Sequence, residues 1–496
     1  MNTARAKEKE SKSCMQSNIE FKKGFYSNIL KLGSYQYSSE VLSFLSSIIL
    51  ARLLLPKEYG IVAMISVVTN FAMIFAGAGI ASEIIRNDYG FTFHKSMANL
   101  SLIIGLGLCL FTCMLAYPLA LFYNNMNLVY PTLLISTQFI FRGMSLTPQA
   151  LLQKELKFNY MGKLTFFSNL FTIVMMIVLA LLDFSYWALI IPLPVTHFIK
   201  YIFLARKTGL PFRIYPWKYT VVAFRKAKSI IGNITGFKTI NYWARNVDNI
   251  LIGKIYGEAS LGIYNRGYRF LNLSLKLITR LFDTVLYPSL KKLQDQGGPV
   301  RKEYLNILGI ISLINFPVGL VLILFPQTFV RIMWGPNWMQ VADLLPYFGL
   351  LVMSQTINST AGSLFILFKK ERVLLTVGTI SAALMVGAIV WGSLYSMLHV
   401  IRYYALTYLA LIVPITIVFG FIRACGYSLR SLLPFWLPKL ILSLGILTSL
   451  WTDHYLVTCI LMGTYLLHLL HFQRNEIMLF SQFTIRKVHK FVVNGK

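Results

Sequence analysis

Apolar runs of roughly twenty residues follow one another along almost the whole chain. A run of this length matches an α-helix that crosses the hydrocarbon core of a bilayer. Separated by short polar or Pro/Gly breaks, the runs predict about fourteen helices, which makes the chain an all-α integral membrane protein. The predicted ranges are 28–52, 58–83, 96–122, 127–146, 162–182, 185–205, 229–253, 259–287, 304–326, 340–367, 373–393, 398–421, 432–450 and 454–471. A transmembrane β-barrel would instead alternate polar and apolar residues over about ten positions.

A short motif recurs about 200 positions along the chain, at 51–64 and again at 253–266. In the first copy a small residue and a cation, Ala51 and Arg52, end one apolar run, and Gly60-Ile61 opens the next. The second copy places Gly253, Lys254 and Gly262-Ile263 at the matching positions. This repeated corner predicts two related lobes, the architecture of many transporters.

The predicted organisation follows from this repeat. A polar tail at 1–24 has no apolar core ahead of a cleavage site, so no removable signal peptide is expected. Next come a six-helix lobe at 25–205, a basic linker at 206–228 with two prolines, and a second six-helix lobe at 229–421. Two helices at 432–471 have no counterpart in the first half and are predicted to form an appended pair, followed by a tail at 472–496.

The chain carries 47 Lys and Arg against 18 Asp and Glu, a net charge of +29. In a soluble protein this excess would indicate nucleic acid, but here the cations lie in connections at alternate ends of the predicted helices. They occur at 86–95, 154–163, 206–228, 291–302, 369–372 and 423–430 and in both tails. The positive-inside rule therefore places both termini in the cytoplasm and gives no reason to expect a nucleic-acid partner.

Ionisable residues inside membrane helices are costly and are functional candidates by default. Four cations of the predicted helix 259–287 project within an arc of about 80°. The candidate substrate-binding residues are Arg266, Arg269, Lys276 and Arg280 from this stripe, with Arg245 and the corner residue Arg52. The candidate ion-coupling carboxylates are Glu40, Asp248 and Asp283.

Several of these candidates also have a structural alternative. Lys276 and Arg280 could extend to the cytoplasmic interface, as long cationic side chains do. Arg245 and Asp248 are three positions apart and could neutralise each other. Arg52 could be an ordinary interface cation.

The sequence carries no motif for catalysis or for a cofactor. The seven His are scattered, the five Cys lack paired spacing, and there is no phosphate-binding loop or acidic cluster for metal ligands. We therefore expect no enzymatic activity, no metal and no cofactor. A membrane polymerase or ligase of polysaccharides would also need a large outer loop, and every predicted outer loop is short.

Several segments resemble a known family. They are Ala-Arg-Leu-Leu-Leu-Pro-Lys-Glu-Tyr-Gly (51–60), Arg-Asn-Val-Asp-Asn-Ile-Leu-Ile-Gly (245–253), Leu-Gly-Ile-Tyr-Asn-Arg-Gly-Tyr-Arg (261–269), Leu-Tyr-Pro-Ser-Leu (286–290) and Trp-Gly-Pro-Asn-Trp (334–338). They are similar to bacterial polysaccharide transporters, in the branch of Wzx-type flippases that includes the colanic-acid and teichuronic-acid exporters. The resemblance covers roughly 25–425, and its signature falls here on Arg245, Asp248, Asn249, Gly253, Gly262, Tyr264, Arg266 and Arg269.

This resemblance implies the fold of the multidrug/oligosaccharidyl-lipid/polysaccharide exporters, with two six-helix bundles in a V. It also implies a substrate, an oligosaccharide repeat unit on a polyprenyl diphosphate, moved across the bacterial cytoplasmic membrane for O-antigen, capsule or exopolysaccharide synthesis. The implied partners are membrane lipids and the polymerase machinery, with the chain acting as a monomer. The alternatives are a drug or small-cation exporter of the same superfamily, which would be expected to carry acidic residues in its cavity, and the membrane polymerase or ligase.

Overall fold

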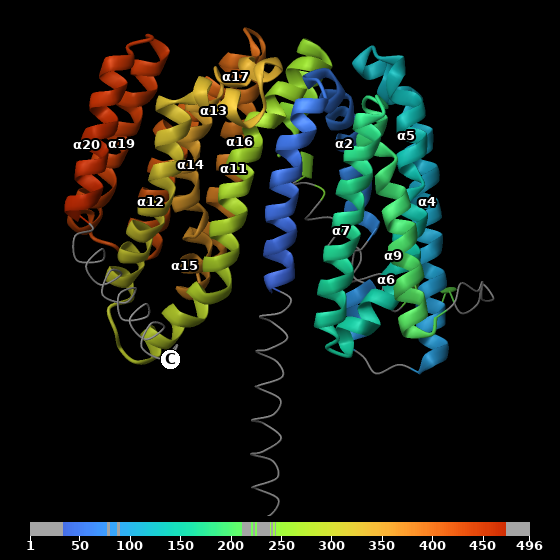
Figure 1. The fold of residues 1–496 in the computed structure, drawn as a ribbon. Helices are drawn as coiled ribbons and strands as arrows, with labels where there is room; N and C mark the ends of the chain where they lie inside the picture. The colour runs from blue at the N-terminus through green and yellow to red at the C-terminus, as the bar shows by residue number, and fades with distance from the viewer. Residues whose placement is uncertain are drawn as a thin grey trace, which may run out of the picture. The chain divides into compact units, whose positions relative to one another are not determined.

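A computed structural model describes residues 33–76, 80–86, 90–210, 220–221, 224–225, 239, 242–243 and 245–472. Every regular element within these residues is a helix (Figure 1), which confirms the predicted all-α class. Eight helices in this part of the chain are long and apolar enough to cross a membrane. The total of fourteen stays a prediction. Both predicted tails and most of the linker at 206–228 lie outside the described residues.

The chain divides into two compact units, the first ending at Trp243 and the second beginning at Ala244. Unit 1 contains a helix at 33–53 followed by a series of labelled elements. These are α2 (Pro56–Ala76), α3 (Ile80–Arg86), α4 (Phe91–Tyr123), η1 (Met126–Leu128), α5 (Val129–Ser136), α6 (Gln138–Lys154), α7 (Phe158–Leu181), α8 (Trp187–Ile190) and α9 (Pro192–Thr208).

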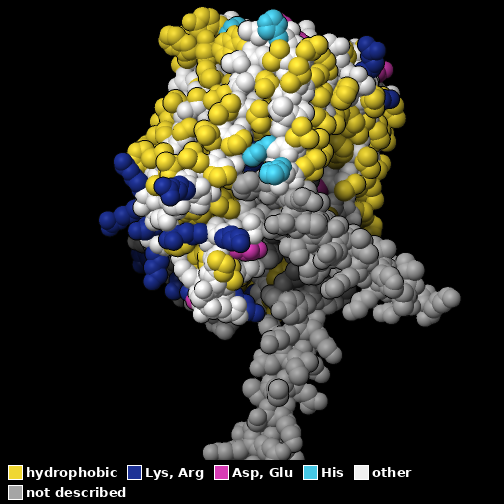
Figure 2. Space-filling view, turned by 90° about the vertical axis from the view of Figure 1, so that its left-hand side faces the viewer, with side chains coloured by type: hydrophobic (Ala, Val, Ile, Leu, Met, Phe, Trp, Pro, Cys, Tyr) yellow, Lys and Arg dark blue, Asp and Glu magenta, His cyan; other side chains and the backbone are white. Residues whose placement is uncertain are grey.

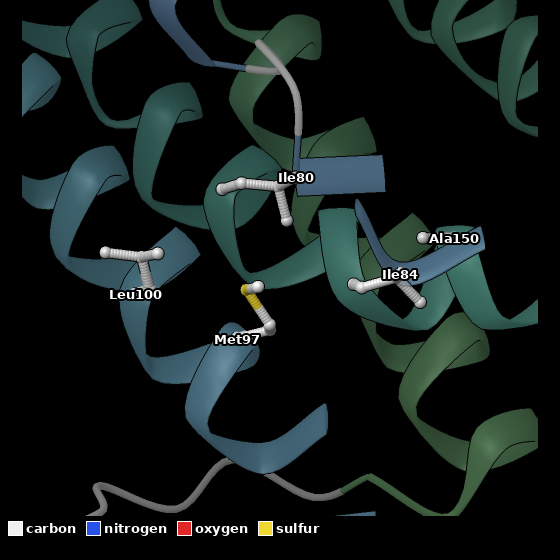
Figure 3. Close-up of a cluster of buried hydrophobic side chains, with 5 residues drawn as sticks. All are labelled: Ile80, Ile84, Met97, Leu100 and Ala150. Carbon is white, nitrogen blue, oxygen red and sulfur yellow. The ribbon is translucent and has the colours of Figure 1, made fainter. Parts of the chain in front are cut away.

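In unit 1, α4 and α6 pack closely along a seam where each helix carries a glycine. A Cβ atom added to Gly105 would lie 2.5 Å from the carbonyl oxygen of Phe139, and one added to Gly143 would lie 2.5 Å from that of Ser101. Small residues allow membrane helices to approach backbone to backbone in this way. Beside the seam, α3, α4 and α6 enclose the buried cluster drawn in Figure 3, formed by Ile80, Ile84, Met97, Leu100 and Ala150.

Unit 2 opens with α11, the longest helix described. Its elements are α11 (Val247–Asp295), α12 (Val300–Leu324), α13 (Pro326–Met333), η2 (Pro336–Val341), α14 (Leu345–Ser359), α15 (Ala361–Leu367), α16 (Glu371–Ser393), α17 (Met397–Thr407), η3 (Tyr408–Ile412), α18 (Val413–Ile415), η4 (Thr416–Ala424), α19 (Leu429–Trp451) and α20 (Tyr455–Phe472). Both η3 and η4 are π-helical.

The two helices predicted as an appended pair, α19 and α20, lie side by side in Figure 1 and pack on α12. Phe316 of α12 stacks on Tyr465 of α20, with ring centroids 5.6 Å apart. Lys439 of α19 is 4% exposed and donates to the hydroxyl of Ser312 at 3.2 Å. The pair is therefore joined to unit 2 by both apolar and polar contacts.

The surface of unit 2 separates charge from hydrophobic area. Figure 2 shows Lys and Arg gathered toward one end of this face, next to a broad hydrophobic surface. The exposed cations at or near the helix ends of this unit include Lys291, Lys292, Arg301, Lys302, Lys369, Lys370, Arg372, Arg423 and Arg430, and Lys254 and Arg331 are exposed as well. This distribution is typical of a multi-pass membrane protein, in which lipid covers the apolar band.

Candidate functional site

The repeated corner has the same form in both units. In unit 1 the helix at 33–53 ends, Leu55 is non-helical, and α2 begins at Pro56. In unit 2 the matching position is Gly257, where φ is 80° and ψ is −176°, so that α11 is in fact two helical segments joined at a break. This backbone conformation is essentially restricted to glycine. Gly257 lies between the two predicted helices 229–253 and 259–287.

Burial also follows the repeat. The small residues Ala51 and Gly253 are buried at the ends of their helices, and the cations that follow them, Arg52 and Lys254, are exposed. The glycines that open the next helix, Gly60 and Gly262, are buried in both copies. The sequence repeat therefore corresponds to a structural repeat, with a cation held at the surface of each corner.

A buried carboxylate connects the two segments of α11. Asp248 precedes the break and is 4% exposed, and its Oδ2 accepts a hydrogen bond from the hydroxyl of Tyr264 at 3.0 Å. Its Oδ1 accepts from the backbone N–H of Asn249 at 2.8 Å. Among the described residues Asp248 forms no ion pair with Arg245, which is exposed, so the alternative of a neutralising pair gains no support from the structure.

The cationic stripe of α11 does not lie in one environment. Arg266 is 3% exposed, and its guanidinium carbon lies 4.4 Å from the ring centroid of Trp338 and 5.4 Å from that of Trp334. Arg269 is half-buried and Lys276 is exposed. The two tryptophans belong to Trp-Gly-Pro-Asn-Trp, one of the segments that carry the family resemblance.

The remaining candidates lie apart from this contact. Glu40 is half-buried on the helix at 33–53 of unit 1, and Arg52 lies near the end of the same helix. Arg280 and Asp283 belong to α11, and their side chains lie outside the described part of the structure. The structure therefore brings Asp248 to Tyr264 and Arg266 to two tryptophans, and leaves Arg245, Arg269 and Lys276 at or near the surface of unit 2.

Sequence reasoning missed a group of half-buried amides beside the π-helical segments. The side chain of Gln355 donates to the hydroxyl of Tyr404 at 3.1 Å. Asn358, one turn further along α14, donates to the hydroxyls of Tyr408 and Thr416 at 3.2 and 3.3 Å. Two amides within the predicted apolar run 340–367 were the available signal, because a membrane helix rarely carries them without a partner.

The comparisons with known proteins agree on the family and the fold. A family model described as "Polysaccharide biosynthesis protein" matches residues 49–343. An uncharacterised membrane protein of the cps region of Klebsiella pneumoniae is 26% identical over 330 residues, 65% of this chain and 67% of that protein. The lipopolysaccharide biosynthesis protein WzxC of Escherichia coli is 24% identical over 66% of each chain. The teichuronic acid biosynthesis protein TuaB of Bacillus subtilis is 23% identical over 60% of this chain and 62% of its own. The chain thus matches about two thirds of the length of these relatives.

Two solved structures have a similar fold. The lipid II flippase MurJ, in an inward closed conformation, gives a TM-score of 0.66 at 16% identity, over 90% of this chain and 99% of that one. An inward-facing multidrug transporter of the MATE family gives 0.58 at 12% identity, over 78% and 95%. These similarities confirm the predicted transporter fold. Because the family model covers more than half of the 496 residues, the chain belongs to the polysaccharide biosynthesis protein family.

Proposed function

We propose that this protein is a flippase that moves oligosaccharides linked to a polyprenyl diphosphate from the cytoplasmic to the outer leaflet of a bacterial cytoplasmic membrane. The observation that carries the proposal is the extent of the family match, because residues 49–343 include parts of both units. The similarity therefore concerns a two-unit transporter and not one half of it. The names of related proteins point to surface polymers, and one of these relatives is the succinoglycan biosynthesis transport protein ExoT of Rhizobium meliloti.

The physical chemistry of such a substrate agrees with the distribution of charge. The diphosphate head group cannot enter hydrocarbon unaided, whereas the polyprenyl tail remains in the lipid. Cations within membrane-spanning units can receive this head group. Moving the anion outward across an inside-negative membrane is favourable by about 2.3 kcal/mol per charge per 100 mV, so the potential can contribute to the driving force.

We assign separate roles to the predicted cations. Arg269 and Arg245, which are accessible in unit 2, and Arg52, at the corner of unit 1, are the head-group contacts that we favour. Arg266 is enclosed by Trp334 and Trp338 and therefore has a positioning role, holding η2 against α11. Lys276 and Arg280 stay candidates nearer the predicted cytoplasmic end, and Asp248 is the preferred coupling carboxylate because it is buried beside the break in α11.

The test is a strain that lacks the gene. We expect loss of the surface polymer and accumulation of lipid-linked repeat units on the cytoplasmic face, where spheroplasts protect them from added glycosidases. Expression of the wild-type chain from a plasmid should restore both. Normal polymer together with hypersensitivity to cationic drugs would refute the flippase and favour a drug exporter, and polymer loss with units exposed on the outer face would favour a polymerase.

A further inference from the structure

Two cationic side chains and a histidine meet inside unit 1, at positions that sequence reasoning passed over. Arg142 lies on α6, and His197 and Lys200 lie one turn apart on α9, which packs against α6. Both Arg142 and Lys200 are close enough to His197 to interact with it electrostatically, and Arg142 interacts in the same way with Lys200. All three side chains are half-buried.

His197 lies far from either end of the membrane-spanning stretch that contains it. The membrane-spanning stretch that contains α9 runs from Trp187 to Thr208, 22 residues, and His197 falls near its middle. At a rise of 1.5 Å per residue, that position is about 15 Å from each end. An imidazole cannot reach a membrane interface over such a distance, so the explanation applied to terminal lysines and arginines fails here.

Among the described residues, no carboxylate forms an ion pair with Arg142, His197 or Lys200, and none of their side chains makes a hydrogen bond. Their electrostatic neighbours are one another. Two half-buried cations beside a histidine, without an acid, destabilise the membrane-embedded protein by repulsion between the cations and by desolvation. Grouped cations of this kind become favourable when an anion lies among them.

The backbone beneath the cluster is held firmly. Gly143, directly after Arg142, lies against the backbone of α4 at the glycine seam described above. Phe141 and Phe198 pack together beside the cluster, with ring centroids 5.0 Å apart. The contacts of α6 with α4 and α9 therefore fix the positions from which the side chains of Arg142, His197 and Lys200 extend.

We propose that Arg142, His197 and Lys200 form a binding site for a diphosphate group, which in the membrane is the head group of the lipid-linked sugar. The guanidinium of Arg142 suits two-point contact with phosphate oxygens, and Lys200 adds a compact positive charge. His197, which interacts with both, supplies a ring N–H. The proposal rests on the proposed function for the identity of the lipid, but the recognition of a diphosphate can be measured separately.

The experiment measures binding to purified full-length protein in detergent. The probes are farnesyl diphosphate, inorganic pyrophosphate and farnesol, and the test variant carries Arg142→Gln together with Lys200→Gln. We expect the affinity for farnesyl diphosphate to fall at least about tenfold, because each lost contact is charge-assisted. Lys154→Gln is the matched control, because it also removes a cation from α6. The ammonium of Lys154 lies outside the cluster and donates to the carbonyl oxygen of Ile84 at 3.2 Å.

Two outcomes would support the site, and they differ in whether the free diphosphate or the lipid-linked diphosphate is the ligand. Binding of pyrophosphate that is lost in the double variant means that the diphosphate alone suffices, whereas binding restricted to farnesyl diphosphate means that the lipid tail is needed. Unchanged binding of both probes in a folded double variant would overturn the inference, and so would farnesol competing as well as farnesyl diphosphate. If the double variant does not fold, Lys200→Gln alone and the charge-conserving Arg142→Lys provide the same comparison, with loss expected only for the first.

The binding result is separable from the proposed function. The wild-type protein could bind diphosphate through these residues while the deletion strain exports normal polymer. This pair of results would support the binding site and refute the proposed flippase function. The deletion strain could instead lose its polymer while diphosphate binding does not depend on these residues. This pair of results would support the flippase function and refute the binding site.

Discussion

Gly257 gives a sharp prediction for a single residue. Its backbone has a positive φ of 80°, yet a Cβ atom at this position would meet nothing within 4 Å, so the constraint is purely conformational. We expect Gly257→Ala to lower the free energy of unfolding by about 1–3 kcal/mol. Gly378→Ala is the matched control, because Gly378 also has open space around it but is an ordinary helical residue in α16.

Thermal unfolding of the two variants in detergent makes this comparison. The control should be unchanged or more stable by roughly 0.5–1 kcal/mol, since alanine is favoured over glycine inside a helix. Equal melting temperatures for both variants would show that the break at Gly257 does not exist in the folded protein.

Arg266 and Arg269 are expected to respond differently to the same substitution. Arg266→Gln removes a desolvated cation–π contact with two tryptophans and should lower stability by about 2 kcal/mol. Arg269→Gln should leave stability within about 0.5 kcal/mol and reduce polymer export at least tenfold, as expected for a lost charge-assisted contact with substrate. Measuring melting temperature and surface polymer for both variants separates a positioning residue from a binding residue. A loss of export without a loss of stability in Arg266→Gln would contradict the assignment.

Individual residues also mark the limit of the sequence prediction. The sequence predicted Arg266 as a substrate-binding cation of a membrane helix, but not its tryptophan partners, because nothing in the chain links position 266 to 334 and 338 before folding. The same reason hid Arg142, the one charged residue of the predicted run 127–146, and the pair His197 and Lys200 within 185–205. Their significance depends on the contact between α6 and α9.

Among the elements, the contact between α4 and α6 is the most sensitive to a methyl group. We predict that Gly105→Ala destabilises the protein by about 1–3 kcal/mol, because the new Cβ would lie 2.5 Å from a backbone oxygen that cannot move alone. Gly107→Ala, two positions along the same helix, is the control, because a Cβ there meets nothing within 4 Å. Unfolding curves for both variants provide the test, and a stable Gly105→Ala would mean that the helices are further apart.

Helices were predicted well wherever a continuous apolar run determined them. The predicted range 373–393 corresponds to α16 at Glu371–Ser393, and 162–182 to α7 at Phe158–Leu181. Prediction failed where backbone geometry overrides hydrophobicity. The run predicted at 340–367 is divided into η2, α14 and α15, and α11 continues through Pro288 to Asp295, eight residues beyond the predicted end at 287.

For the whole molecule, the distribution of cations predicts topology. The exposed Lys and Arg of unit 2 gather toward one end of the face in Figure 2, and the positive-inside rule places that end in the cytoplasm. We therefore predict that green fluorescent protein fused after Lys496 will be fluorescent and that alkaline phosphatase at the same site will be inactive. Fusions in the connection around Asp453, between α19 and α20, should give the opposite pair of signals. An active phosphatase at the C-terminus would reverse the orientation of the entire chain.

The two-unit organisation was predictable because the corner motif is short, local and present twice. Its helix break, buried small residues and surface cations all recur in the structure, and each depends on residues within about a dozen positions of one another. The boundary between the units was harder to predict, because it depends on contacts made throughout the fold. The structure divides at 243/244, whereas sequence composition favoured the basic stretch at 206–228.

The π-helical segments have a consequence for how this protein fits its bilayer. The membrane-spanning stretch Met397–Ala424 has 28 residues and would measure about 42 Å as a regular α-helix, against a hydrocarbon thickness of about 30 Å. Its wider π-helical turns, η3 and η4, take up part of this excess length. Rewinding one such turn to α-helical geometry would lengthen the stretch and move one of its ends. The π-helical turns therefore bring the length of this stretch closer to the thickness of the bilayer.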